Sequence, residues 1–228
     1  MTGSGAKPFI ALEGSDGSGK GTHFALTLAY LTREGIEYQA EDFPQYEKAS
    51  SAMVRLYLNG ELGSLDEIGP ELASTFYAID RAFAAERIKE AQKLGKLVLT
   101  NRFFGSNLGH QGSKIDDLET RREFYRWAQD LEFNRLGVPR PDLNIVFLVP
   151  AEIAQARVDM KETRSYTSKK RDLHEADINH LRRTVAVYEE LCELFPDLFV
   201  PIEGVHNGKE LPPEEIQKLV IAKIEEVL

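Results

Sequence analysis

A short glycine-rich stretch near the start of the chain carries the clearest chemistry. Residues 14–20, GSDGSGK, fit the pattern G-x-x-x-x-G-K between an apolar run and a helical pattern. Glycines let a backbone curl until its N–H groups point at an anion, and the positive end of the next helix adds to the attraction. Lys20 supplies a mobile cation for the outer phosphates. The pattern predicts a nucleoside triphosphate site, most simply for ATP, made by Gly14, Ser15, Asp16, Gly17, Ser18, Gly19, Lys20, Gly21 and Thr22.

The position after Lys20 departs from the usual form of this pattern. A hydroxyl that helps to hold magnesium normally follows the lysine, but Gly21 stands there and Thr22 comes one residue later. We expect Thr22 to approach Mg²⁺ or a phosphate. We also expect Mg²⁺ to be held mainly by the phosphates and by water, with Asp16, Glu13 or Thr22 nearby.

A second stretch, LVLTNRFFGSNLGHQG at 97–112, reads as a buried strand that stops at Asn101-Arg102 and opens into a polar segment broken by glycines. Ligands of α/β proteins bind at the carboxyl ends of parallel strands. The segment is therefore a candidate part of the site, although Asn101 is an amide where a nucleotide site would ordinarily carry a carboxylate.

The bulk composition excludes several classes of protein. The net charge of −9 argues against broad nucleic-acid binding, which needs a basic face. No apolar run approaches the roughly 20 residues of a membrane helix. The single cysteine, Cys192, excludes an intrachain disulfide, so we expect a reduced, cytoplasmic protein with that side chain buried.

Apolar runs alternate with longer helical patterns along the whole chain. We expect strands at 9–14, 38–43, 96–101, 143–149 and 198–203, and helices at 20–34, 47–59, 70–94, 117–136, 151–161, 175–195 and 212–228. Such alternation with buried strands predicts a five-stranded parallel sheet between two layers of helices, a three-layer α/β/α domain. We expect one domain at 8–228 after a flexible leader at 1–7.

Three segments resemble the thymidylate kinases, a family of P-loop nucleoside monophosphate kinases. They are LEGSDGSGK (12–20), DFP (42–44) with TFYAIDRAFAAERI (75–88), and NRFFGSNLGHQG (101–112), which is similar to the family's DR-[YHF]-x-x-S-x-x-x-x-Q-G. The resemblance implies phosphoryl transfer from ATP with Mg²⁺ to dTMP, and a homodimer. It also implies a short lid, at about 160–175, in which Arg164 and Arg171 are the leading catalytic cations beside Lys20 and Arg102.

The resemblance also assigns residues to the acceptor nucleotide. Asp16 matches an aspartate that reaches the sugar 3′-hydroxyl, and Arg102 matches the arginine that holds the acceptor phosphate. The matched residues around the base are Phe43, Pro44, Tyr77, Ser106 and Gln111, and Arg81 matches an arginine that contacts the base or the acceptor phosphate. We expect His110, which is next to Gln111, to line the same pocket. Two simpler interpretations stay open: Arg81 paired with Asp80 at the surface, and Tyr77 as a core residue.

Two other functions also stay open. The acceptor could be another pyrimidine monophosphate, because Tyr46 replaces a frequent arginine and His110 is unusual. From a different class, the chain could be a nucleotide-binding regulator that has lost turnover, an idea favoured by Asn101 and Gly21.

Overall fold

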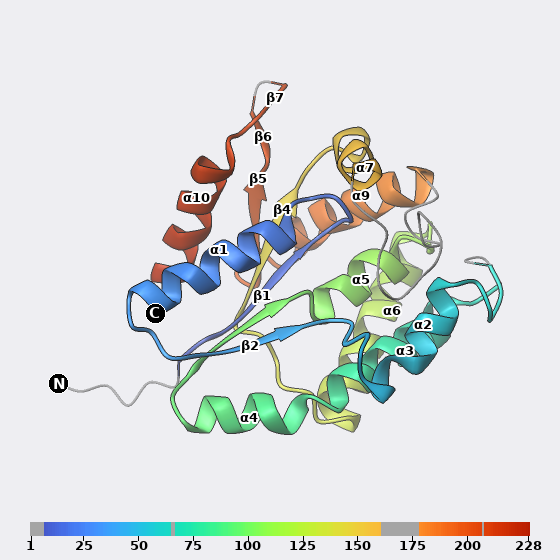
Figure 1. Ribbon diagram of the computed structural model, residues 1–228. Helices are drawn as coiled ribbons and strands as arrows, with labels where there is room; N and C mark the ends of the chain where they lie inside the picture. Colours follow the sequence, from blue (N-terminus) through green and yellow to red (C-terminus); the bar gives the residue numbers. More distant parts are fainter. Residues whose placement is uncertain (1–6, 65–66, 161–177, 207) are drawn as a thin grey trace.

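A five-stranded sheet lies at the centre of the computed structural model, which describes residues 7–64, 67–160, 178–206 and 208–228 (Figure 1). The strands run in the order β2-β3-β1-β4-β5 and all their pairings are parallel. Their bounds are β1 Phe9–Gly14, β2 Tyr38–Asp42, β3 Leu97–Asn101, β4 Leu143–Leu148 and β5 Phe199–Glu203. The predicted parallel sheet is therefore confirmed.

Helices cover both faces of this sheet, so the predicted three-layer architecture is confirmed too. Along β1, Phe9 and Ala11 pack into one apolar cluster while Ile10 and Leu12 pack into another. The helices α1 (Lys20–Arg33) and α10 (Pro213–Glu225) close the second cluster, and α4 (Ala85–Lys93), α6 (Leu118–Gln129) and α9 (Ile178–Leu194) close the first. Figure 1 shows α1 and α10 on one side of the sheet, with α4 and α6 on the other.

Several predicted helices are interrupted. The expected helix at 70–94 is two helices, α3 (Pro70–Ala82) and α4, and the one at 47–59 is a 3₁₀ turn at Ala49–Ser51 followed by α2 (Ala52–Leu58). The pattern at 117–136 is α6 continued by a π-helix at Asp130–Arg135. The helix α7 runs from Ala151 to Asp159, and an unpredicted hairpin joins β6 (Val205–His206) to β7 (Lys209–Glu210).

The sequence predicts no helix in the glycine-broken segment after Arg102, but α5 (Phe104–Gly112) is a buried helix there. Its glycines permit close packing. A Cβ on Gly105 would lie 2.9 Å from the carboxylate of Glu13, and one on Gly109 would lie 2.6 Å from the ring of Tyr188. The helix can therefore press against β1 and α9 where a side chain would hold it away.

Two expectations fall largely outside the described residues. They are the leader at 1–7, except for Lys7, and the lid at about 160–175, except for Met160, with both of its catalytic arginines, Arg164 and Arg171. Within the described part of the chain, no helix is both long and apolar enough to cross a membrane. Cys192 is buried and free, as expected.

The close packing of α5 makes a stability prediction. Gly109→Ala should lower the free energy of unfolding by about 1–3 kcal/mol, because the new methyl group overlaps the Tyr188 ring. The matched control is Gly21→Ala, in the exposed first turn of α1, where no atom lies within 4 Å of the new Cβ. That control should be neutral or stabilising by up to about 1 kcal/mol. Urea denaturation measures both, and equal effects would contradict the packing argument.

Candidate active site

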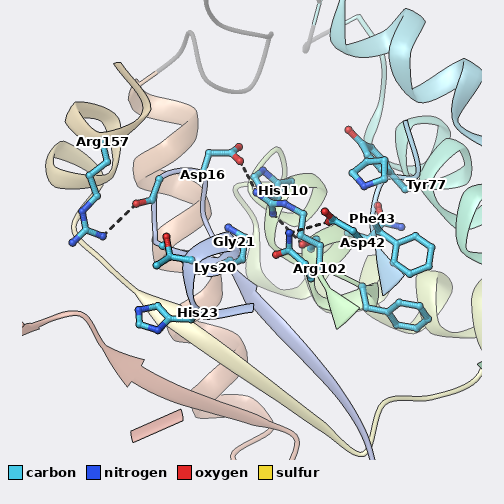
Figure 2. A pocket seen from close by; sticks show the side chains of 18 of the residues that line it. Asp16, Lys20, Gly21, His23, Asp42, Phe43, Tyr77, Arg102, His110 and Arg157 are labelled. Carbon is cyan, nitrogen blue, oxygen red and sulfur yellow. Dashed lines mark hydrogen bonds and ion pairs between the residues drawn. The ribbon is translucent and has the colours of Figure 1, made fainter. Parts of the chain in front are cut away.

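A cavity of about 690 Å³ opens where β1, β2 and β3 end (Figure 2). It takes in the phosphate loop at Gly17, Gly19, Lys20, Gly21 and Thr22. The fold also brings to its wall all nine residues that the sequence assigned to the acceptor: Asp16, Phe43, Pro44, Tyr77, Arg81, Arg102, Ser106, His110 and Gln111. The remaining loop residues, Gly14, Ser15 and Ser18, lie behind this surface, and both serines are buried.

The phosphate loop is curled as its glycines predict. Gly14, Gly17 and Gly19 have φ angles of 137°, 78° and 98°, a region that side chains disfavour. Position 17 requires glycine for a second reason: a Cβ there would lie 2.0 Å from the carbonyl oxygen of Ala154 in α7. The Nζ atom of Lys20 donates to the Ser15 carbonyl oxygen at 2.6 Å and so closes the loop into a ring. The loop thus surrounds a space for phosphate at the start of α1.

Arg102 is held in a strained backbone conformation. It is the one described non-glycine residue with a positive φ, 63°. This left-handed conformation costs about 1–2 kcal/mol. Hydrogen bonds fix it on both sides: the Arg102 N–H donates to the Leu12 carbonyl oxygen at 2.9 Å, and the Phe103 N–H donates to the Glu13 carboxylate at 2.8 Å. Strain maintained in this way is typical of functional sites.

Glu13 is an anchor below the site: it does not line the cavity, and its expected place near Mg²⁺ stays a prediction. Its side chain has no exposed surface. Besides the Phe103 N–H, it accepts hydrogen bonds from the hydroxyls of Ser106 at 2.6 Å and Tyr188 at 3.3 Å. Burial raises the pKa of this carboxyl group, while the hydrogen bond from Ser106 acts in the opposite direction.

The guanidinium of Arg102 gathers several of the predicted residues around it. It pairs with Asp16 at 2.5 Å and donates to Ser106 Oγ at 3.1 Å, and its Nη1 lies 3.1 Å from Nε2 of His110. Burial and the nearby Arg102 charge lower the pKa of His110 well below its usual value. His110 is therefore neutral at pH 7, and its Nε2 accepts a hydrogen bond from Nη1 of Arg102.

Gln111 stands out because its amide is unsatisfied. The residue is 1% exposed and lines the cavity, yet neither its Oε1 nor its Nε2 has a hydrogen-bond partner in the structure. Buried amides rarely remain unpaired, because leaving such a group unsatisfied costs about 1–3 kcal/mol. This amide indicates a ligand that offers both a donor and an acceptor at this wall.

Arg81 has a partner that the sequence did not suggest. It forms two hydrogen bonds of 2.6 Å to the carboxylate of Glu132, which lies on the π-helix and is fully buried. The open alternative of a surface pair between Arg81 and Asp80 is therefore wrong. Tyr77 is half-buried: it packs edge-on against Tyr57 and also lines the cavity.

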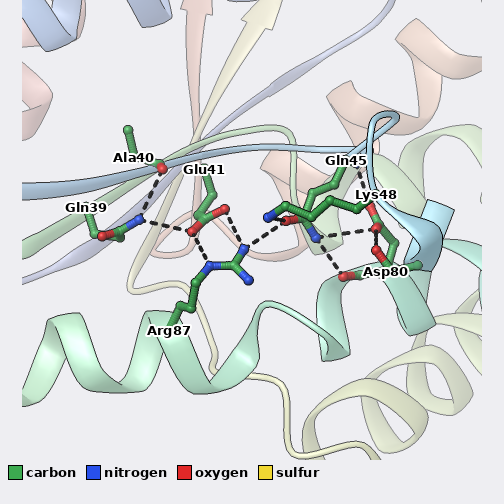
Figure 3. Close-up of polar contacts among 8 residues, drawn as sticks. Gln39, Ala40, Glu41, Gln45, Lys48, Asp80 and Arg87 are labelled. Carbon is green, nitrogen blue, oxygen red and sulfur yellow. Dashed lines mark hydrogen bonds and ion pairs between the residues drawn. The ribbon is translucent and has the colours of Figure 1, made fainter. Parts of the chain in front are cut away.

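The turn at Phe43-Pro44 is fastened by a polar network (Figure 3). The buried carboxylate of Asp80 accepts the backbone N–H of Gln45 at 2.7 Å and the hydroxyl of Ser50 at 2.5 Å. The Gln45 side chain also bridges to Arg87, which in turn pairs with Glu41 on β2 at 2.9 Å. Asp80 thus ties the wall formed by Phe43 and Pro44 to α3.

Sequence reasoning missed the other end of the cavity. His23, Arg157 and Glu210 meet there from α1, α7 and β7. Arg157 pairs with Glu210 at 2.5 Å and reaches the Gly17 carbonyl oxygen at 3.4 Å, and the ring of His23 stacks on Phe147. No local pattern marks these residues, because each comes from a different element. They place a cation, Arg157, beside the phosphate loop.

Comparisons with known proteins agree with this geometry. A sequence profile of the family described as thymidylate kinase matches residues 12–211. A protein named thymidylate kinase from Mycobacterium tuberculosis is 32% identical over 184 residues, covering 80% of this chain and 85% of that protein. A probable thymidylate kinase from Thermococcus kodakarensis is 31% identical over 209 residues, covering 87% and 93%. The chain belongs to the thymidylate kinase family.

The cavity of this thymidylate kinase family member suits Mg²⁺ bound together with phosphates. No cluster of three or more His, Cys, Asp or Glu side chains that could hold a metal occurs in the described ranges. Mg²⁺ needs less, because it commonly uses one or two carboxylates plus substrate phosphates and water. The exposed hydroxyl of Thr22 and the carboxylate of Asp42 both open into the cavity and offer such oxygen ligands.

The role of Asp80 gives a prediction that separates the two nucleotides. Asp80→Asn removes an acceptor from the turn at Phe43-Pro44, so we expect the KM for the acceptor to rise several-fold while the KM for ATP stays within about two-fold. Steady-state kinetics measures both constants. Asp116→Asn, an exposed change of the same kind, is the control and should alter neither. A parallel rise of both constants would mean that Asp80 supports the fold and not the acceptor wall.

Proposed function

We propose that the chain catalyses phosphoryl transfer from ATP to dTMP, giving ADP and dTDP. The observation that carries this proposal is the unpaired Gln111 amide, buried in the same cavity as the phosphate loop around Lys20. A pyrimidine edge offers a carbonyl oxygen and an N–H, which would satisfy both atoms of that amide. The family match supports this reading and does not favour the two alternatives, another pyrimidine monophosphate or a regulator without turnover.

The chain's part in this reaction is to position and to neutralise. The loop N–H groups and Lys20 would bind the phosphates of ATP, with Arg157 beside them. The planar fork of Arg102 would hold the acceptor phosphate, and Asp16, already paired with Arg102, would reach the sugar. Thr22 and Asp42 offer oxygen ligands that would hold Mg²⁺ together with ATP, and the ion would supply positive charge beside the phosphates. The attacking phosphate oxygen is already deprotonated, so no strong general base is needed.

A lid would complete the site. We propose that Arg164 and Arg171, which lie outside the described residues, stabilise charge on the transferred group, and that closure of the segment excludes water. Tyr77 would stack on the base and Arg81 would contact the base or the phosphate. Because Glu132 engages two nitrogens of Arg81, we expect Arg81 to act from a fixed position.

A panel of acceptors tests the proposed function. With ATP and Mg²⁺, we expect ADP release to be fastest with dTMP and much slower with dCMP, UMP and dGMP. A preference for dCMP or UMP would overturn the choice of acceptor. Binding of both ATP and dTMP without product would establish the regulator instead.

A variant in the same panel tests the observation on which the choice of acceptor rests. Gln111→Ala should weaken dTMP binding about ten-fold or more, since two hydrogen bonds to the base are lost. Binding of ATP should not change. If this variant keeps the native preference for dTMP over the other acceptors, the buried amide does not determine the choice of acceptor.

We also propose a homodimer, as the family resemblance implies. Leu72 and Ile79 on α3 and Phe83, the residue that caps its C-terminal end, form one apolar stripe, and they are 52%, 38% and 71% exposed. Exposed apolar stripes of this kind often mark an interface. We propose that a second copy of the chain covers this one.

The stripe yields a prediction about mass in solution. Phe83→Ser should shift the chain from dimer to monomer in sedimentation equilibrium at micromolar concentration, because it removes the most exposed apolar side chain of the stripe. Leu219→Ser, a change at an exposed leucine of α10 on the other side of the sheet, should leave the mass unchanged. A monomeric native chain, or a dimer insensitive to Phe83→Ser, would contradict this interface.

A further inference from the structure

Two neighbouring strands end in a pair of polar side chains that face each other. Asp42 and Asn101 are the last residues of β2 and β3 and are direct partners in the parallel register. The Nδ2 atom of Asn101 donates to Oδ1 of Asp42 at 2.9 Å, and both residues line the cavity. The pair therefore stands at the carboxyl edge of the sheet, where ligands of this architecture bind.

Asp42 differs from the other acidic residues of the cavity wall. Asp16 pairs with Arg102, Glu210 pairs with Arg157, and Asp80 is buried within the network of the turn. Asp42 is exposed, and its hydrogen bond from Asn101 comes from a neutral amide. Within the described ranges, it is the one carboxylate of the cavity wall that is open to solvent and forms no ion pair.

The exposed carboxylate of Asp42 is unexpected in a cavity that is built to bind phosphate. The cavity holds the phosphate loop and Lys20, and polyphosphate bound there would repel a nearby negative charge. A divalent cation between carboxylate and phosphate turns that repulsion into attraction. Mg²⁺ is commonly bound in this way, with one or two carboxylates, several waters and the phosphate oxygens.

Asn101 is suited to orient Asp42 without adding charge. Its Nδ2 donates to Asp42, while its Oδ1 is buried on the far side of the amide and has no hydrogen-bond partner. The opposite orientation would set an amide oxygen against a carboxylate oxygen. A carboxylate at position 101 would place two like charges about 3 Å apart, and one of them would tend to take up a proton.

We propose that Asp42 is the protein carboxylate that holds Mg²⁺, directly or through one water, against the bound phosphates, and that Asn101 is its positioning residue. This inference rests on the proposed function, since that function brings ATP and Mg²⁺ into the cavity. It assigns to the end of β2 a task that neither the sequence pattern nor the match to the family profile assigned to it.

The experiment measures metal binding as well as turnover. Mn²⁺ replaces Mg²⁺, and electron paramagnetic resonance follows its binding to the full chain with dTMP and the β,γ-imido analogue of ATP. Asp42→Asn should weaken Mn²⁺ binding about ten-fold or more and raise the Mg²⁺ concentration needed for half-maximal ADP release. The dissociation constant of dTMP should stay within about two-fold. Glu47→Gln, an exposed neighbour that loses the same charge, is the control and should change none of these quantities.

Variants at position 101 sharpen the test. Asn101→Asp adds a second carboxylate, so we expect tighter Mn²⁺ binding with dTMP affinity roughly intact. The exchanged pair, Asp42→Asn with Asn101→Asp, moves the charge to the neighbouring strand and should recover most of the Mn²⁺ affinity. Circular dichroism melting curves check that each variant is folded, and Asp42→Ala replaces Asp42→Asn if the latter is not.

The outcomes separate this inference from the proposed function. If the native chain forms dTDP but Asp42→Asn binds Mn²⁺ as the native chain does, Asp42 has no role at the metal and only the inference fails. A large loss of dTMP affinity with unchanged Mn²⁺ binding would place the pair in the acceptor pocket and also overturn it. If the native chain forms no dTDP, the proposed function fails whatever the Mn²⁺ affinities are.

Discussion

The fully buried carboxylate of Glu13 holds together the segments that follow the central strands. Glu13 sits at the end of β1 and accepts hydrogen bonds from the backbone after Arg102, from Ser106 on α5 and from Tyr188 on α9. Burying a charge costs several kcal/mol unless donors compensate, so these groups must meet in one arrangement. That arrangement forces the left-handed turn at Arg102 and aims its guanidinium into the cavity. The position of the guanidinium thus follows from a residue that does not line the cavity.

The close approach of α5 to the sheet is the second condition for the site. This helix carries Ser106, His110 and Gln111 on the cavity side, while Gly105 and Gly109 face the sheet and α9. The glycines therefore set how deep the polar side chains lie. Larger residues in place of these glycines would keep α5 farther from the sheet. The side-chain amide of Gln111 would then be exposed to water and would not be kept unpaired for a ligand.

Sequence reasoning could predict whatever depends on local pattern. The periodicity gave the five strands within one or two residues, and the glycine spacing marked the loop around Lys20. It failed for α5, because glycine usually weakens a helix unless a neighbour packs against it. It also could not find Glu132 as the partner of Arg81, since 51 residues separate them and only the fold joins them. Nor could it pair Asn101 with the carboxylate of Asp42, since the two are neighbours only through the register of β2 and β3.

Because the π-helix after α6 carries Glu132, the ion pair with Arg81 depends on the number of residues in this segment as well as on their types. A π-turn holds one residue more than an α-turn, so it works as a one-residue insertion absorbed without breaking the helix. Each residue of an α-helix turns the chain by about 100°, and deletion of Asp130 or Leu131 would swing Glu132 away from Arg81 by that angle. The buried guanidinium would then lose its counter-ion although no side chain near the cavity had been replaced. In this part of the chain, the number of residues is constrained as tightly as their identity.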